Sequence, residues 1–313
     1  MDELKVFSGR AHPALSGQIA DYLGVRLGQA TIENFPDGEV LVRLNEDVRG
    51  RDVFIVQPTC APGNDNLMEL LIFIDCARRA SAERITAVVP YFGYARQDRK
   101  DVGRVPISAK LVANLITTAG TSRVLTMDLH AAQVQGFFDI PVDNLIAEPI
   151  LSRHFADKDL GDLVLVSPDA GNAKCARRYA NRLGGSMAII DKQRVNASQT
   201  EMDRIIGDVR GKTVLMMDDM ITTGGTVAEA ARLCKAEGSG EVYVGATHGV
   251  LSGPAVERLS AAPIEEVVVT NSIPVPDETV RELAKLTVLP VADLIGEAIH
   301  RIHHHESISS LFV

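Results

Sequence analysis

Two stretches of the chain repeat one another, and this repeat restricts what the chain can fold into. Residues 47–56 read DVRGRDVFIV and residues 208–217 read DVRGKTVLMM, an offset of 161 positions. A second pair, IADYLGV at 19–25 and YANRLGG at 179–185, has nearly the same offset. After each DVRG come an apolar run, a polar loop, an amphipathic helical pattern and another apolar run. The pattern indicates an internal duplication of one α/β unit.

Apolar β-rich runs alternate with helical patterns along the whole chain. Several runs, among them LVLVSPDAG (163–171) and EEVVVTNS (265–272), are apolar on both faces, as parallel strands covered by helices are. We therefore expect an α/β fold of two duplicated Rossmann-like domains, each a mainly parallel sheet flanked by helices. The predicted domains are residues 1–145 and 146–299, and residues 300–313 are expected to form a tail that packs on the first domain.

Charge and hydropathy exclude several classes of protein. A formal net charge of −9 argues against a general nucleic-acid binder, so any anion site must be local. No apolar run reaches membrane-spanning length, and the first residues, MDELKVFSG, do not resemble a signal peptide. The four cysteines form no CxxC pair and are expected to be reduced thiols. We expect a cytoplasmic protein that binds neither nucleic acid nor membranes.

The stretch VLMMDDMITTGGTVAEA (214–230) combines two opposed chemistries. A Gly/Thr turn that opens a helix suits phosphate, because backbone N–H groups point at the ligand. The preceding carboxylates of Asp218 and Asp219 repel phosphate, but they accept hydrogen bonds from sugar hydroxyls. A sugar phosphate would satisfy both ends of the loop. The plainer alternative is that the two acids only cap the helix. The sequence patterns of a P-loop and of a dinucleotide-binding loop are absent.

Other polar segments follow predicted strands. The basic segment PYFGYARQDRK (90–100) offers arginines, whose planar donors match phosphate oxygens, although a solvated basic loop has the same composition. In FPDGE (35–39) the phenylalanine is suited to stack on a base, although FPDGE alone reads as a turn. A polar segment, DKQRVNASQTEMDR (191–204), lies between two predicted strands and has the composition of a surface loop; a loop of this kind is able to close over bound substrates.

Together these segments carry a family resemblance. With NDNLMELL (64–71), MDLHAAQVQGFFDIPVDNL (127–145), SPDAG (167–171) and ESISSLF (306–312), they resemble the ribose-phosphate diphosphokinases over nearly the full chain. The resemblance implies two phosphoribosyltransferase-type domains, the first on the ATP side and the second on the ribose 5-phosphate side. It also implies transfer of the diphosphoryl group of ATP to the anomeric hydroxyl of ribose 5-phosphate. The products would be 5-phosphoribosyl 1-diphosphate and AMP, for nucleotide, histidine and tryptophan biosynthesis.

The resemblance also implies roles for individual residues. ATP would be bound by Phe35, Asp37, Glu39, Arg96, Gln97 and Arg99, of which the first three come from a neighbouring subunit. Mg²⁺ would be bound by His130 and Asp169, and Lys192 and Arg194 would be catalytic. Ribose 5-phosphate would be bound by Asp218, Asp219, Thr222, Thr223, Gly224, Gly225 and Thr226. This chain departs from the family pattern at several positions; many relatives carry Asp where it has Thr222 and Gly where it has Asn172.

The resemblance extends to regulation and assembly. It implies a hexamer of the phosphate-activated, ADP-inhibited class. The effector residues would be Arg49, Ser81, Gln135, Asn144, Ser307 and Ser309. Two other functions fit part of the pattern. The sugar-phosphate motif alone permits a phosphoribosyltransferase, which needs no second domain for ATP. A non-catalytic regulatory relative of the synthetases is the other alternative, although such relatives typically have altered catalytic loops and KQR (192–194) is intact here.

Overall fold

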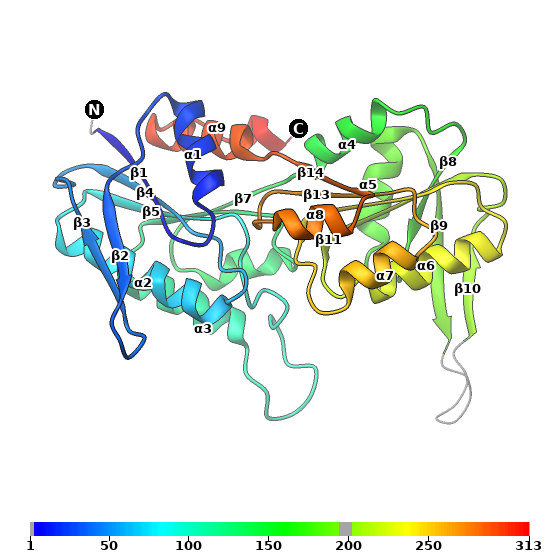
Figure 1. Cartoon of the computed structure of the whole chain (residues 1–313), viewed down its shortest axis with the longest axis horizontal. Helices are drawn as coiled ribbons and strands as arrows, with labels where there is room; N and C mark the ends of the chain where they lie inside the picture. The colour runs from blue at the N-terminus through cyan, green and yellow to red at the C-terminus, as the bar shows by residue number, and fades with distance from the viewer. Residues whose placement is uncertain (1–2, 194–201, 313) are drawn as a thin grey trace. The chain divides into compact units, whose positions relative to one another are not determined.

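The chain forms two compact α/β units. The computed structural model describes residues 3–193 and 202–312. The first unit comprises residues 1–146, 272–274 and 290–313, and the second comprises residues 147–271 and 275–289. The sheets are mainly parallel and flanked by helices, as predicted (Figure 1). The described residues contain no helix that is both long and apolar enough to cross a membrane.

The first unit is built on a five-stranded parallel sheet in the order β1-β4-β5-β6-β7. These strands are β1 (Leu4–Ser8), β4 (Asp52–Val56), β5 (Arg84–Val89), β6 (Arg123–Met127) and β7 (Val142–Leu145). A separate antiparallel hairpin consists of β2 (Ala30–Asn34) and β3 (Val40–Leu44). The helices are α1 (Pro13–Leu23), α2 (Gly63–Arg79), α3 (Ser108–Ala119), η1 (Ala132–Phe137), α9 (Ala292–His303) and η2 (Ser309–Phe312).

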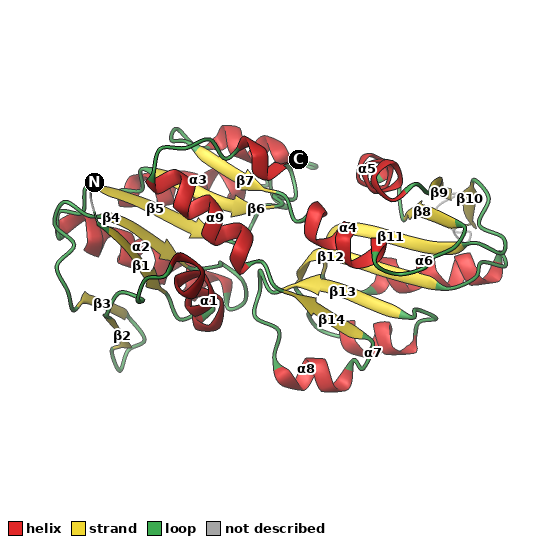
Figure 2. Ribbon diagram, turned by 90° about the horizontal axis from the view of Figure 1, so that it is seen from above, coloured by secondary structure: helices red, strands yellow, loops and turns green. Residues whose placement is uncertain are grey.

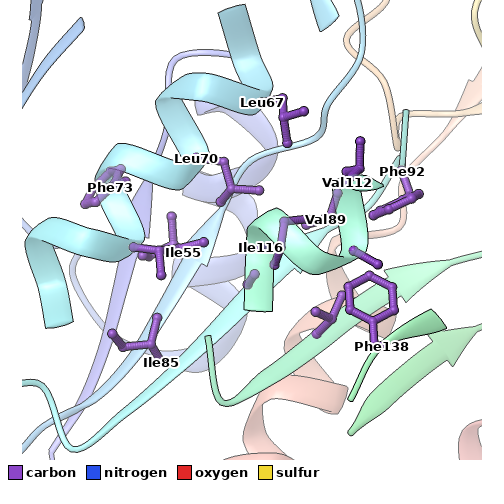
Figure 3. Close-up of a cluster of buried hydrophobic side chains, with 14 of the residues drawn as sticks. Ile55, Leu67, Leu70, Phe73, Ile85, Val89, Phe92, Val112, Ile116 and Phe138 are labelled. Carbon is purple, nitrogen blue, oxygen red and sulfur yellow. The ribbon is translucent and has the colours of Figure 1, made fainter. Parts of the chain in front are cut away.

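The core of this unit follows from the spacing of apolar residues on its helices. Leu67, Leu70, Phe73 and Ile74 recur three and four positions apart on α2, which places them on one face of the helix. Figure 3 shows Leu70 and Phe73 in one buried cluster with Ile55 of β4, and this cluster also includes residues of α3. Phe73 is completely buried, and burial of such a ring contributes about 2–3 kcal/mol. The sheet and the helices α2 and α3 are therefore held together by one apolar core.

Helix α9 belongs to the first unit although it lies close to the end of the chain. It packs on α1, beside which it lies in Figure 1. A Cβ atom on Gly296 would lie 2.5 Å from Cδ1 of Tyr22, so glycine permits this close approach. The Tyr22 hydroxyl also donates a hydrogen bond to Glu297 Oε2 at 3.0 Å. Residues 290–313 thus belong to the first unit, and the tail predicted for residues 300–313 lies within this part of the chain.

The second unit contains a seven-stranded sheet in the order β10-β9-β8-β11-β12-β13-β14, and Figure 2 shows β11 to β14 of this sheet side by side. Among the described residues of the sheet, β10 alone is antiparallel to its neighbour. The strands are β8 (Leu163–Ser167), β9 (Ser186–Gln193), β10 (Met202–Ile206), β11 (Thr213–Ile221), β12 (Val242–Gly249), β13 (Glu266–Thr270) and β14 (Leu286–Leu289). The helices are α4 (Glu148–Ala156), α5 (Ala173–Leu183), α6 (Gly225–Ala236), α7 (Ala255–Ala261) and α8 (Asp277–Glu282).

The duplication is confirmed in the sheet order and in the turns. The first sheet, β1-β4-β5-β6-β7, has the same crossover pattern as the segment β8-β11-β12-β13-β14 of the second. Each DVRG forms the same turn before a strand. Gly50 has φ 63° and Gly211 has φ 71°, a left-handed conformation that glycine adopts without steric cost. The aspartates that begin the two turns each accept a hydrogen bond from the backbone N–H two residues later, at 3.0 and 3.1 Å.

Candidate active site

Acidic side chains gather at the carboxyl ends of two neighbouring strands of the second unit. Asp218 and Asp219 lie near the end of β11, and Asp169 follows the end of β8. β8 and β11 pair directly and in parallel, so their carboxyl ends lie at the same edge of the sheet. This edge is where open α/β sheets bind their ligands.

The Asp218 carboxyl is strongly perturbed by its surroundings. Burial raises its pKa to about 8, with further contributions from a hydrogen bond with the Asp219 side chain and from the negative charges of Asp219 and Asp169. The Asp219 backbone N–H acts in the opposite direction by donating to Asp218 Oδ1 at 2.9 Å. In the absence of a bound cation, Asp218 is therefore mostly protonated at neutral pH. The pair then carries less negative charge than two ionised carboxylates would.

The loop that follows β11 ends in a conformation that opens a helix. Gly224 is the N-cap of α6 and has φ 69°, in the left-handed region that favours glycine. A Cβ atom there would lie 3.1 Å from Leu259 Cγ. Ser252 N donates to Thr222 O at 2.9 Å, and Arg258 Nη1 donates to Thr223 O at 3.3 Å. The carbonyl oxygens of Thr222 and Thr223 thus accept hydrogen bonds from other residues of the second unit. The first N–H groups of α6 have no acceptor within the helix, so they are suited to bind an anion.

Asn172 connects the two acidic strand ends, a role that sequence reasoning missed. Its backbone N–H donates to Asp169 Oδ1 at 2.9 Å, and its side-chain Nδ2 donates to Met217 O at 2.7 Å. Met217 directly precedes Asp218. The only signal in the sequence was the departure from Gly at this position. The amide side chain ties the Asp169 turn to β11.

The two residues predicted to bind a metal belong to different units. His130 is exposed and lies three residues after the end of β6 in the first unit, and Asp169 is exposed in the second. Within residues 3–193 and 202–312, no group of three or more His, Cys, Asp or Glu side chains is arranged to hold a metal ion. The carboxylates of Asp169, Asp218 and Asp219 are oxygen donors, which Mg²⁺ prefers.

The basic segment of the first unit follows β5. Gly93 lies where a Cβ atom would be 2.5 Å from Thr59 O, so the chain passes very close to the loop after β4. Gln97 Oε1 accepts a hydrogen bond from Ser108 Oγ at 2.5 Å. Arg96 is exposed, and Arg99 Nε donates to Asp101 Oδ1 at 2.8 Å on the surface. These side chains therefore face solvent from a loop whose start is tightly packed.

The FPDGE segment forms the turn of the β2–β3 hairpin. Phe35 N donates to Glu39 O at 2.8 Å, and Gly38 has φ 96°. The Phe35 side chain is 49% exposed, and Asp37 and Glu39 are exposed as well. A large aromatic side chain at an exposed turn is available to a ligand or to another molecule.

The two predicted catalytic residues fall at the end of β9. The backbone of Lys192 belongs to β9 and pairs with Asp203 of β10. Its side chain is not among those that the structure describes, and Arg194 lies outside the described residues. The backbone register thus places Lys192 in an antiparallel hairpin next to β8, the strand that leads to Asp169.

The predicted effector residues lie at several points of the first unit. Gly50 N donates to Ser81 O at 2.9 Å, which brings the turn of Arg49 against Ser81. Asn144 Oδ1 accepts from Leu129 N at 3.1 Å, and Gln135 lies in η1. In the tail, Ser309 N donates to Ser307 Oγ at 3.2 Å. The structure thus brings together the Arg49 and Ser81 segments of this set.

The comparisons with known proteins identify the family. The family described as the N-terminal domain of ribose phosphate pyrophosphokinase matches residues 4–120, and the phosphoribosyl synthetase-associated domain matches residues 195–313. A ribose-phosphate pyrophosphokinase from Rhodopirellula baltica is 58% identical over 100% of this chain and 99% of its own length. One from Caldanaerobacter subterraneus subsp. tengcongensis is 54% identical over 99% and 98%.

A solved structure agrees with these relatives. The phosphoribosylpyrophosphate synthetase from Mycobacterium smegmatis superposes with a TM-score of 0.93 at 44% identity, over 97% of this chain and 100% of that one. The likeness covers both units and the segments between them. The chain belongs to the ribose-phosphate pyrophosphokinase family.

Proposed function

We propose that this chain transfers the diphosphoryl group of ATP to ribose 5-phosphate, giving 5-phosphoribosyl 1-diphosphate and AMP. The single observation that carries the proposal is the end of β11, where an acidic pair is followed by a Gly/Thr loop that opens α6. Relatives that are 53–58% identical over nearly their full length, in several bacteria, are named ribose-phosphate pyrophosphokinases. The product supplies nucleotide, histidine and tryptophan biosynthesis.

In the proposed reaction the anomeric hydroxyl of the sugar attacks the β-phosphorus of ATP. A new bond forms between that oxygen and the β-phosphorus, and the bond from the β-phosphorus to the α–β bridging oxygen breaks, so that AMP leaves. The hydroxyl proton passes to solvent. Catalysis of phosphoryl-type transfer depends mainly on positioning and on charge stabilisation, so the protein needs donors and cations more than a covalent partner.

We assign ribose 5-phosphate to the second unit. Asp218 and Asp219 would accept hydrogen bonds from the sugar hydroxyls, and the loop from Thr222 to Thr226 would hold the 5-phosphate through backbone N–H groups. The raised pKa of Asp218, about 8, supports this assignment. A carboxyl that keeps its proton repels the nearby phosphate less than an ionised carboxylate does. Thr222, in place of the acid that many relatives carry, reduces the negative charge further.

We assign ATP to the first unit. Arg96 and Arg99 would contact the triphosphate and Gln97 would assist them, because guanidinium groups match phosphate oxygens. Phe35, Asp37 and Glu39 would recognise adenine in the site of a neighbouring subunit. The exposure of Phe35 at the hairpin turn supports a contact outside its own chain. The proposed assembly is a homo-oligomer, a hexamer by resemblance.

We propose Mg²⁺ as the cofactor, with His130 and Asp169 as residues that hold it. Asp169 offers a carboxylate oxygen, the kind of ligand that Mg²⁺ prefers, and a divalent cation would offset the negative charge that Asp169 and Asp219 place near Asp218. When bound, the ion neutralises charge on the phosphates of ATP. Lys192 and Arg194 would add positive charge beside the transferred group and are the proposed catalytic residues.

For regulation we propose activation by inorganic phosphate and inhibition by ADP. The proposed effector residues are those named above in the Arg49 and Ser81 turns, in η1 and β7, and in the tail. The hydrogen bond between Gly50 and Ser81 supports a shared site for the first two. The proposed domains are residues 1–145 for ATP, 146–299 for ribose 5-phosphate and 300–313 as the tail, in a cytoplasmic enzyme.

The decisive experiment identifies the products. The protein is mixed with ATP, ribose 5-phosphate and Mg²⁺, and the products are resolved by phosphorus NMR. AMP and 5-phosphoribosyl 1-diphosphate in equal amounts are expected. Formation of ADP with a phosphorylated sugar, or no consumption of ATP, would refute the proposal. A series in phosphate and ADP tests the regulation, and the mass in solution with and without phosphate tests the assembly.

A further inference from the structure

Arg10 lies between a buried acid and the hairpin that carries Phe35. It follows β1 by two positions. Its backbone N–H donates to Glu69 Oε1 at 2.7 Å, and its side-chain Nε donates to Glu69 Oε2 at 2.6 Å. Both carboxylate oxygens of Glu69 are thus held by one residue. The Glu69 side chain is only 3% exposed, whereas that of Arg10 is 44% exposed, so Arg10 extends from a buried carboxylate to the surface.

The inner end of Arg10 is fixed by a polar network in the first unit. A buried carboxylate needs donors, because desolvation without partners costs free energy. Gln57, which is completely buried, supplies another donor with Nε2 to Glu69 Oε1 at 3.0 Å. Gln57 Oε1 accepts from Ala11 N at 3.0 Å. On Gly9, a Cβ atom would lie 2.2 Å from Gln57 Oε1, so the chain on each side of Arg10 packs against this glutamine.

The outer end of Arg10 reaches the hairpin. Nη1 of its guanidinium donates to Asn34 Oδ1 at 2.6 Å, across 24 positions of sequence. Asn34 is the last residue of β2, and its Nδ2 donates to Gly38 O at 2.9 Å within the turn. A continuous chain of hydrogen bonds therefore runs from the buried Glu69 through Arg10 and Asn34 to the turn between Phe35 and Glu39.

The turn of the hairpin is closed by its own hydrogen bonds, among them Phe35 N to Glu39 O and Glu39 N to Asp37 Oδ1, but these bonds do not tie the turn to the rest of the unit. β2 and β3 pair only with each other and are not part of the five-stranded sheet. The base of the hairpin packs on the core through residues such as Ile32 and Val42, whereas residues 33–39 are exposed. A two-stranded hairpin is marginally stable without such packing. Arg10 is thus placed to restrict the part of the hairpin that lies beyond the core.

We propose that Arg10 is a positioning residue for nucleotide recognition. By holding Asn34, it sets the orientation of the turn that presents Phe35, and it thereby lowers the entropic cost of ordering that turn when ATP binds. Arg10 itself touches no substrate. The inference rests on the proposed role of Phe35 in adenine binding and adds to it the residue that fixes the turn.

The test is the kinetics of Arg10→Ala with each substrate varied separately. We expect KM for ATP to rise about tenfold, since a hydrogen bond to a charged group is lost, while KM for ribose 5-phosphate changes by less than about twofold. Turnover at saturating ATP is expected to stay close to that of the unaltered protein. Equal changes in both KM values, or no change in KM for ATP, would overturn the inference.

A double-mutant cycle separates positioning from a general effect on folding. Arg10→Ala and Asn34→Ala act on the same link, so the double variant should raise KM for ATP no more than the larger single effect does. Multiplying effects would show that the two residues act independently, against the proposal. The matched control is Arg182→Ala, which removes an arginine that pairs with the largely buried Glu148 in the other unit. It should leave both KM values unchanged.

Phe35→Ala distinguishes a failure of the inference about Arg10 from a failure of the proposed adenine site. If that variant raises KM for ATP and Arg10→Ala does not, the further inference is wrong and the proposed nucleotide site stands. If Phe35→Ala leaves KM for ATP unchanged while the product assay still yields AMP, the assignment of the hairpin to adenine is wrong, and the inference about Arg10 falls with it. The melting temperature of each variant is measured as well. A variant that melts at the same temperature as the unaltered protein is folded, so a change in its KM reports on binding.

Discussion

Replacing Asp218 by Asn should stabilise the substrate-free protein, and more so as the pH rises. Asn has almost the same shape as a protonated aspartic acid. Its amide is able to donate to Asp219 as the Asp218 carboxyl does, and its oxygen is able to accept the Asp219 N–H bond of 2.9 Å. The substitution therefore removes the ionisation of Asp218 and leaves its contacts in place.

The magnitude follows from the pKa of Asp218. Burial and the neighbouring acids raise this pKa from 3.8 to about 8 in the folded protein. Between these values the folded state binds the proton more tightly than the unfolded chain, so the free energy of unfolding falls as the pH rises. The loss grows by about 1.4 kcal/mol for each pH unit and reaches about 4 kcal/mol at pH 7. The loss is complete above about pH 8, where both states are ionised. The Asp218→Asn variant avoids this loss, because an amide does not ionise.

The assay is urea unfolding of both proteins at pH 5, 6 and 7, without substrates or divalent cations. The free energy of unfolding of Asp218→Asn minus that of the unaltered protein should increase with pH by about 1.4 kcal/mol per unit. Asp162→Asn, an exposed acid of the same unit, serves as the control and should stay within about 0.5 kcal/mol at each pH. A difference for Asp218→Asn that is constant across the three pH values would refute the reasoning.

Three further predictions concern the remaining parts of the proposed site. Lys192→Ala should lower kcat about 100-fold and change KM little, because a cation that stabilises the transition state is removed; near-normal turnover would exclude a catalytic role. Thr222→Asp adds a negative charge beside the proposed phosphate and should raise KM for ribose 5-phosphate, with a larger effect at low ionic strength; the same KM at two salt concentrations would contradict the assignment. Gly93→Ala should lower the free energy of unfolding by about 2 kcal/mol, because the new Cβ would lie 2.5 Å from Thr59 O. Gly17→Ala should raise the free energy of unfolding by about 0.5–1 kcal/mol, because a Cβ there meets nothing within 4 Å and alanine favours the helix. Equal melting temperatures for the two alanine variants would show that the close approach at Gly93 carries no cost.

Much of the fold can be predicted from the sequence, because the residues that determine it lie close together in the chain. The DVRG turns depend on a glycine in the left-handed region and on an aspartate that accepts a bond from two residues ahead. The apolar runs and the helical spacing around Leu70 and Phe73 are periodic over a few turns. The Asp218 to Thr226 stretch is contiguous, so its acidic end and its helix N-terminus are visible without a structure.

Other features were decided only by the tertiary structure, because they join residues far apart in the chain. The Asn172 amide reaches Met217 O, 45 positions away, because β8 and β11 are neighbours in the sheet. The pKa of Asp218 depends on its burial and on Asp169 of the adjacent strand end. Arg10 reaches Asn34 because β1 ends beside a buried glutamate of α2. The sequence by itself determined which local elements form and which chemistry they carry, and the sheet order decided which side chains act on one another.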